Sequence, residues 1–281
     1  MIRFHPYAGR APLVLALLAL MTAGCRFPGQ PKDADRPIPP DRVLAFDALY
    51  RQNCSGCHGA DGKLGPAPPL NDGLFRAIVP TKTVEDVVAG GRPGSLMPAF
   101  GTEQGGPLTK AQVAVLVNEI KGIPYRVEEK DQEVEVVRDP KGAAPAWGAP
   151  GPASEGAPPY LAAADAIGDA AAGRSRFATA CASCHGDHGQ GVSKDGRIAR
   201  AINEPAFLSL ISDQNLRRIM ITGRSDLGMP DYAHHGKEAL TPEDVLNLVA
   251  FLRTQGNSTP TSHPEPAAAG EAHHDGTASE P

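Results

Sequence analysis

The chain has 281 residues, of which 5% are aromatic, while Gly and Pro number 31 and 28. This length is enough for two domains of ordinary size, and the composition fits two small cores with unstructured connectors better than one large core. The formal net charge of -5 does not indicate nucleic acid as a partner. The acidic excess lies in residues 126–168 and 257–281, where it is expected to solvate flexible segments.

The N-terminal segment has the pattern of a targeting signal. Two arginines precede an apolar run over 11–23, which is too short to cross a bilayer and matches the central region of a signal peptide. The run ends in Leu-Met-Thr-Ala-Gly-Cys, which resembles the lipobox of bacterial lipoproteins, with Cys25 as the lipid-bearing residue. The alternative is a plain cleaved signal with an incidental cysteine. We therefore predict a signal peptide over 1–24, a lipid anchor and a tether over 25–40.

A short motif that carries the chemistry occurs twice. C-x-x-C-H is the attachment signature of c-type haem, because two thiols at this spacing can bond to the two vinyl groups while the adjacent histidine faces the iron. The two copies consist of Cys54, Cys57 and His58, and of Cys181, Cys184 and His185. A thioredoxin-like pair would need a βαβ unit, and a four-thiol zinc site would have to join pairs that lie far apart in what look like duplicate units. We predict two covalently attached haem c groups.

A second repeated motif supplies the candidate sixth iron ligand. Both repeats read G-R-x4-M-P, with Met97 in the first and Met229 in the second. Met220 is a competitor in the second repeat, but it lies at helical spacing among apolar residues and is assigned to the core. Ligation by histidine and methionine would raise the potential and fill both axial positions, which leaves no open position for substrate.

Helices are expected on both sides of each site. Asp41 is the predicted N-cap of the helix before the first attachment motif, in which Phe46 and Tyr50 share a face. Gly173 and Phe177 hold the same places before the second motif.

A capped helix is predicted to follow each methionine. Thr109 opens a capping box, and the helix that follows has an apolar face made by Val113, Leu116, Val117 and Ile120. Thr241 opens the equivalent helix with Pro242 at its first position. From the Gly-Arg motif to these caps, equivalent residues of the two units keep one constant offset, whereas the offset between the haem cysteines is shorter by five. The sequence is therefore a tandem duplication, and the second copy has a five-residue insertion between its attachment motif and its methionine loop.

These repeats resemble class I cytochrome c. The resemblance implies an all-α fold in which the N- and C-terminal helices of each domain cross beside the haem, with a glycine and an aromatic residue at the crossing. The second repeat matches this pattern with Gly173 and the run 248–252. The first repeat has Phe46 in place of the glycine and Glu119 in place of the aromatic residue, so we expect a wider or differently packed crossing there.

The same resemblance implies a proline carbonyl that orients the proximal histidine. Pro66 is the candidate in the first repeat, with Pro68 and Pro69 close behind. The second repeat has no proline between His185 and Pro205, so another carbonyl must serve there. This difference is expected to separate the two potentials.

Other polar residues leave alternatives open. Arg92 and Arg224 recur in both repeats and would either pair with haem propionates or lie in solvated turns. His188 is expected in a solvated loop. His234 or His235 would be the axial ligand of the second repeat in an alternative conformer.

The predicted organisation is a cytochrome c domain over 41–125, a Pro/Ala/Gly-rich linker over 126–168, a second cytochrome c domain over 169–256 and a disordered tail over 257–281. If the linker is flexible, it would span about 35–40 Å root-mean-square, and direct haem-to-haem transfer would require the domains to dock.

The predicted function is transfer of single electrons between redox protein partners, without enzymatic activity, at the periplasmic face of the cell envelope. Two alternatives, a dihaem enzyme of the peroxidase-like or sulfur-compound type and a haem-based sensor, would need an iron with an open position. A third interpretation agrees with electron transfer: the chain would be a subunit of a quinol-oxidising or oxygen-reducing complex.

Overall fold

The computed structural model describes residues 37–130, 133–152, 156–163, 165–194, 197–235 and 237–256. The predicted signal peptide, Cys25, most of the tether and the C-terminal tail lie outside these residues. The chain divides into two compact units, one ending at Arg42 and the other beginning at Val43. The described part of the first unit holds one 3-10 helix, η2 (Pro40–Arg42), and the other elements belong to the second unit.

The first repeat is built from helices. They are α2 (Phe46–Asn53), α3 (Ser55–His58), α4 (Gly73–Ile78), α5 (Thr81–Gly90), η3 (Thr102–Gln104) and α6 (Lys110–Lys121). The predicted capping box of α6 is confirmed: the Thr109 hydroxyl accepts from the Gln112 N–H, and the Gln112 side chain accepts from the Thr109 N–H.

The predicted N-cap of α2 is wrong. Asp41 lies in η2, which is closed by a hydrogen bond from the Arg42 N–H to the Pro39 carbonyl, and α2 begins only at Phe46 with Ala45 as its N-cap. Burial of Phe46 in the first turn fixes the start of the helix without a side-chain cap. Packing therefore outweighs the local capping signal at this position.

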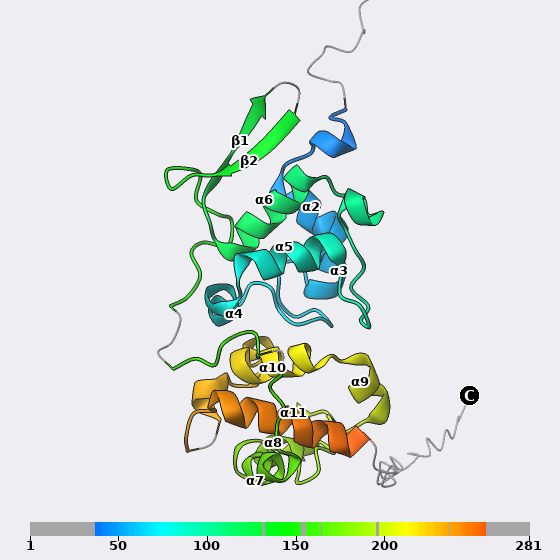
Figure 1. Ribbon diagram of the computed structural model, residues 1–281, viewed down its shortest axis with the longest axis vertical. Helices are drawn as coiled ribbons and strands as arrows, with labels where there is room; N and C mark the ends of the chain where they lie inside the picture. Colours follow the sequence, from blue (N-terminus) through cyan, green and yellow to red (C-terminus); the bar gives the residue numbers. More distant parts are fainter. Residues whose placement is uncertain are drawn as a thin grey trace, which may run out of the picture. The chain divides into compact units, whose positions relative to one another are not determined.

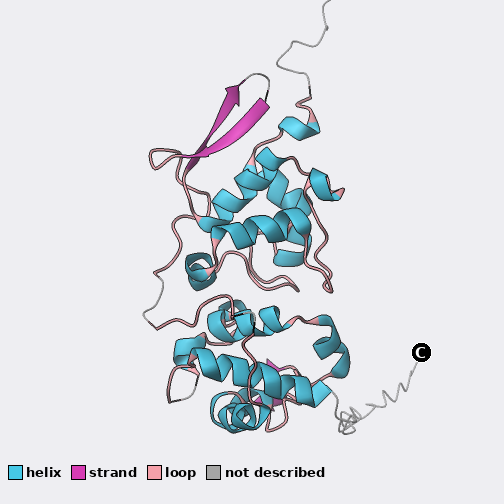
Figure 2. Cartoon of the chain, viewed as in Figure 1, coloured by secondary structure: helices cyan, strands magenta, loops and turns pink. Residues whose placement is uncertain are grey.

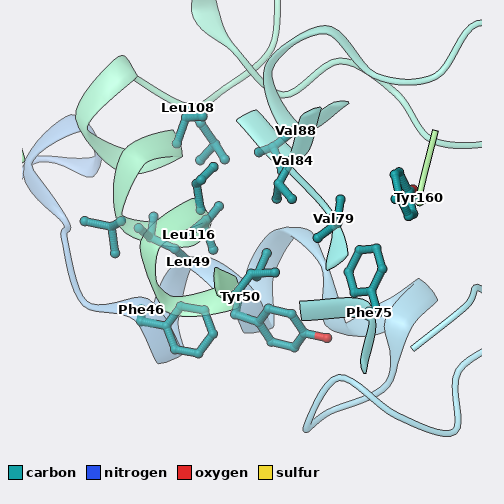
Figure 3. Close-up of a cluster of buried hydrophobic side chains, with 14 residues drawn as sticks. Phe46, Leu49, Tyr50, Phe75, Val79, Val84, Val88, Leu108, Leu116 and Tyr160 are labelled. Carbon is teal, nitrogen blue, oxygen red and sulfur yellow. The ribbon is translucent and has the colours of Figure 1, made fainter. Parts of the chain in front are cut away.

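Buried side chains from α2, α4, α5 and α6 form the core of the first repeat (Figure 3). The apolar face expected on α6 is buried throughout, at Val113, Leu116, Val117 and Ile120. Tyr160, which lies in the segment between the repeats, belongs to the same core and packs on Phe75 with ring centroids 5.8 Å apart. This core therefore includes residues beyond the last helix of the repeat.

Strands are present in addition to the helices, which corrects the all-α prediction (Figure 2). β1 (Tyr125–Lys130) and β2 (Glu133–Arg138) form an antiparallel hairpin in which Tyr125 faces Arg138. The valines of this charged stretch are β-branched and favour the pleated backbone. The fold is therefore helix-rich with small two-stranded sheets.

The second repeat contains the equivalent helices and one more hairpin. Its elements are α7 (Ala170–Ala180), α8 (Ala182–His185), β3 (Val192–Lys194), β4 (Arg197–Ala199), α9 (Pro205–Leu210), α10 (Asp213–Thr222), η4 (Ser225–Leu227), η5 (Tyr232–His234) and α11 (Pro242–Gly256). The predicted cap of α11 is confirmed, since the Thr241 hydroxyl accepts from the Asp244 N–H at 3.1 Å and Pro242 opens the helix.

Backbone hydrogen bonds locate the insertion of the second repeat. The Gly62 carbonyl accepts from the Asn71 N–H, and the Gly189 carbonyl accepts from the Asn203 N–H, so each pair closes the same loop. The two glycines keep the offset of the haem cysteines, whereas the two asparagines keep the longer offset of the methionine loops. The insertion therefore lies in this loop, where the second repeat forms the β3–β4 hairpin.

The helix crossing of the second repeat has the expected composition. α11 runs across α7 in close and extensive contact (Figure 1). A Cβ atom on Gly173 would lie 2.0 Å from the Asn247 carbonyl oxygen, so only glycine permits this approach. Phe177 and Phe251 pack beside the crossing with ring centroids 5.1 Å apart. Among the described residues, no helix combines the length and the apolarity needed to cross a membrane.

Candidate haem sites

Each C-x-x-C-H motif folds into one short helical turn directly after the preceding helix. In the first repeat the N–H groups of Cys57 and His58 donate to the Cys54 carbonyl at 3.2 and 3.0 Å. In the second repeat the equivalent two N–H groups donate to the Cys181 carbonyl at 3.1 and 2.9 Å. The turn places both thiols and the imidazole of each motif together. The first cysteine of each motif is half-buried, and the second is exposed.

The first thiol of each motif does not resemble the reactive thiol of a redox enzyme. Burial raises the pKa of Cys54 and of Cys181 to about 12, so both are protonated at neutral pH in the chain without haem. Reactive cysteines of redox enzymes have lowered pKa values instead. Within the described ranges, no three His, Cys, Asp or Glu side chains gather as a metal-binding group.

The predicted proximal histidine of the first repeat is held by a proline carbonyl, as expected, but by a different proline. His58 Nδ1 lies 2.9 Å from the Pro68 carbonyl oxygen, which corrects the choice of Pro66. The Ala67 N–H donates to the Cys57 carbonyl at 2.9 Å, and this bond holds the chain so that the Pro68 carbonyl faces the imidazole. Burial lowers the pKa of His58, and the Pro68 carbonyl opposes that effect. With Nδ1 engaged, Nε2 is the nitrogen available to iron.

In the second repeat the Arg200 backbone takes the corresponding place. Arg200 directly follows β4 of the inserted hairpin and precedes Asn203 by the same interval at which Pro68 precedes Asn71. Burial lowers the pKa of His185, and the Arg200 backbone opposes this effect. His185 Nδ1 is nevertheless buried without a hydrogen bond of good geometry among the described residues. The imidazole of His185 is therefore oriented less firmly than that of His58.

The two methionine loops are closed by the same backbone bond. The Arg92 N–H donates to the Met97 carbonyl, and the Arg224 N–H donates to the Met229 carbonyl, both at 3.0 Å. The loops follow α5 and α10 in their repeats. The loop that the motif predicts is thus formed twice in the same way.

The glycine of each Gly-Arg motif is required by this loop. Gly91 and Gly223 have φ values of +70° and +66°, which side-chain-bearing residues rarely adopt. A Cβ atom on Gly91 would lie 2.6 Å from the Ala99 nitrogen, and one on Gly223 would lie 2.4 Å from the Pro230 carbonyl oxygen. The chain beyond each methionine therefore passes directly over the glycine.

The competing ligands of the second repeat are separated by their burial. Met220 is 7% exposed and belongs to the apolar core, as predicted. His234 is exposed and its Nδ1 lies 2.8 Å from Asp231. His235 is buried, and its Nε2 has no hydrogen-bond partner in the described part of the chain. His188 is exposed, in agreement with the sequence.

The recurring arginines do not lie in solvated turns. Arg92 donates to the Asn215 side chain, and Arg224 pairs with Asp226 at 2.9 Å and donates to the Gly65 carbonyl at 3.2 Å. Each thus has a partner in the other repeat. The sequence offered no signal for these pairings, because partners in different repeats share no local pattern.

The donor set of each repeat fits a covalently attached haem. Two thiols and an imidazole share one turn, and a thioether lies in a loop of fixed backbone. In the first repeat the imidazole has only Nε2 left to bind iron, which is the arrangement that a proximal ligand needs.

Sequence comparison relates the chain to a family of oxidase subunits. The family described as cytochrome c oxidase, cbb3-type, subunit III matches residues 41–118 and 168–252. The curated cbb3-type cytochrome c oxidase subunit CcoP of Rubrivivax gelatinosus is 24% identical over 228 residues, which are 81% of this chain and 59% of that relative. The chain thus spans less than two thirds of its curated relative. A solved structure, the Kuenenia stuttgartiensis reducing HAO-like protein complex, is 18% identical with a TM-score of 0.40, covering 78% of this chain and 99% of its own.

Proposed function

The chain belongs to the cbb3-type cytochrome c oxidase subunit III family, and on this basis we propose that it is a dihaem c-type cytochrome that carries single electrons within a larger redox complex. The observation that carries the proposal is the attachment turn, which occurs twice with the same backbone hydrogen bonds and with a methionine loop of the same closure in each repeat.

Each repeat contributes four groups to its haem. The proposed thioether bonds would come from Cys54, Cys57, Cys181 and Cys184. The iron ligands would be His58 with Met97 in the first repeat and His185 with Met229 in the second. The bound iron supplies the one-electron couple. The chain's own residues would hold the haem covalently and supply two ligands to each iron, and in the first repeat the Pro68 carbonyl orients the imidazole. No residue is assigned a catalytic role.

The proposed setting is an oxidase of the cbb3 type. A relative that shares 24% identity is named as a subunit of such an oxidase, which supports a redox complex as the partner of this chain. Anchoring through a lipid on Cys25 would hold the two domains at the periplasmic face of the membrane. Mass spectrometry of the purified protein tests this part: we expect a lipid on Cys25 that is lost in Cys25→Ser, whereas an unmodified Cys25 would contradict the anchor.

An optical redox titration of the purified holoprotein tests the function, with the haem-to-chain ratio and the reaction with carbon monoxide recorded. We expect two low-spin haems per chain, both unreactive toward carbon monoxide because methionine occupies the sixth position. The matched control is a Cys181→Ala and Cys184→Ala double variant, which should retain one haem. A high-spin haem in the unaltered protein, or one that binds carbon monoxide, would contradict the electron carrier and favour a dihaem enzyme or a sensor.

A further inference from the structure

A buried arginine of the second repeat contacts residues 64–69 of the first repeat, a stretch that we call the proximal loop. Arg218 lies on α10 and is 4% exposed. Its guanidinium donates to the Pro69 carbonyl and stacks 3.5 Å from the centroid of the Phe75 ring. Stacking on an aromatic face together with donation to a carbonyl fixes a planar guanidinium in one orientation.

This arginine acts beside the group that orients His58. Pro69 follows Pro68, whose carbonyl lies 2.9 Å from His58 Nδ1. The charge of Arg218 is also one of the influences that lower the pKa of His58, after burial. The guanidinium is therefore close enough to act on the proximal ligand both through the loop backbone and through its charge.

The second repeat holds the same loop at two further points. The Leu64 N–H donates to the Asp226 carboxylate at 3.0 Å, and the Gly65 carbonyl accepts from Arg224 at 3.2 Å. Both partners belong to the methionine loop of the second repeat. The proximal loop is thus bound at both ends by the second repeat.

Arg218 keeps its positive charge in this position. Burial lowers its pKa to about 10, which leaves it protonated at neutral pH. No described carboxylate forms a hydrogen bond or an ion pair with it; Asp72, whose charge favours the protonated form, instead accepts from the Phe75 N–H and caps α4. A buried charge without a carboxylate partner is costly, which calls for a role other than stability.

We propose that Arg218 is a positioning residue for the haem of the first repeat, which keeps its native potential only while the second repeat is docked on the proximal loop. The inference rests on the proposed haem ligands. A fixed positive charge beside the loop that orients His58 would favour the reduced state of the bound iron, which carries one positive charge less, and the held loop keeps the imidazole in its orientation. The first haem thus depends on a side chain of the second domain.

The test is a redox titration of full-length holoprotein carrying Arg218→Met or Arg218→Lys. Met97→Ala first identifies which potential belongs to the first repeat. Arg218→Met should shift that potential downward and leave the other in place. Arg218→Lys should recover part of the shift, because it restores the charge but not the planar group. Arg217→Met is the matched control: Arg217 is equally buried on the same helix but donates to the Pro159 and Tyr160 carbonyls, so neither potential should move.

The outcomes separate this inference from the proposed function. Two haems with unchanged potentials in both Arg218 variants, or equal shifts of both haems, would overturn the inference and leave the electron carrier intact. If Arg218→Met does not fold, Arg218→Lys alone decides, with a smaller downward shift of the first haem expected. Fewer than two haems in the unaltered protein would instead count against the proposed function.

Discussion

The two repeats solve the same packing problem at their helix crossing in different ways. In the second repeat Gly173 lets α7 and α11 come into direct backbone contact, with Phe251 beside them. In the first repeat Phe46 and Glu119 stand at the equivalent positions, and contact between α2 and α6 is less extensive. The expectation of a differently packed crossing in the first repeat is therefore confirmed.

The connector between the repeats explains why the first crossing departs from the pattern. Trp147 packs edge-on against Phe46 and Tyr50, with ring centroids 5.3 and 5.1 Å away. The Glu119 carboxylate accepts from the Ala146 N–H at 2.6 Å. Both residues that break the glycine and aromatic pattern thus bind the connector. A departure from a family pattern can therefore mark the place where another segment docks.

Removal of either methionine should have the largest effect, because it should change the haem potential of one repeat and not of the other. Met97→Ala and Met229→Ala should each lower one potential and open one iron to carbon monoxide, because the sixth ligand is lost. Redox titration and carbon monoxide difference spectra check this. An unchanged potential in Met229→Ala would indicate that buried His235, rather than core-packed Met220 or exposed His234, ligates the second iron.

Truncation of the core aromatics should separate the repeats by their dependence on the connector. Phe46→Ala and Phe177→Ala each remove a buried ring and should cost about 3–5 kcal/mol in the free energy of unfolding. Only Phe46→Ala also removes the support of Trp147, so only this variant should speed protease cleavage within 140–152. Denaturant titration and limited proteolysis measure the two effects. Equal cleavage rates in both variants would contradict the packing role of the connector.

The glycine at the second crossing gives a smaller effect. Gly173→Ala should destabilise the protein by about 1–3 kcal/mol, because the added Cβ meets backbone at 2.0 Å. Gly90→Ala is the matched control: it lies in α5 with open space around the added atom, so it should be neutral or stabilising by about 0.5–1 kcal/mol. Denaturant titration measures the free energy of unfolding of both variants. A Gly173→Ala variant as stable as Gly90→Ala would mean that α7 and α11 can move apart without cost.

The helix caps should give the smallest and most similar effects. Thr109→Ala and Thr241→Ala each remove a side-chain hydrogen bond to the first turn and should cost about 1 kcal/mol. Thr109→Ser and Thr241→Ser keep the hydroxyl and should restore most of the loss. Thermal unfolding compares the four variants. A much larger loss of stability at one threonine would contradict the equivalence of the two caps.

Local signals in the sequence predicted much of the fold. The caps at Thr109 and Thr241, the buried face of α6 and the core position of Met220 follow from spacing within one or two helical turns, and all are confirmed. The cap at Asp41 failed because burial of Phe46 sets the start of α2 instead.

The candidate sites were predictable only in part, because local signals do not encode contacts between segments that are far apart in the sequence. The motifs indicate the turn and the loops, but the choice among three prolines depends on how the chain folds back over Cys57. The partners of Arg92, Arg218 and Arg224 come from the other repeat, and no periodicity within one repeat encodes them. Arg218 could be singled out only as a charge among apolar residues on a helix.

Trp147 and Tyr160 determine how much of the chain a fragment of the first half must include. Both side chains pack on the core of the first repeat although they lie well beyond its last helix, which ends at Lys121. A fragment cut at Tyr125 would expose the faces of Phe46 and Phe75 that these rings cover. A fragment that keeps the core of the first half must therefore extend at least through Tyr160, and the duplicated halves are no longer interchangeable modules.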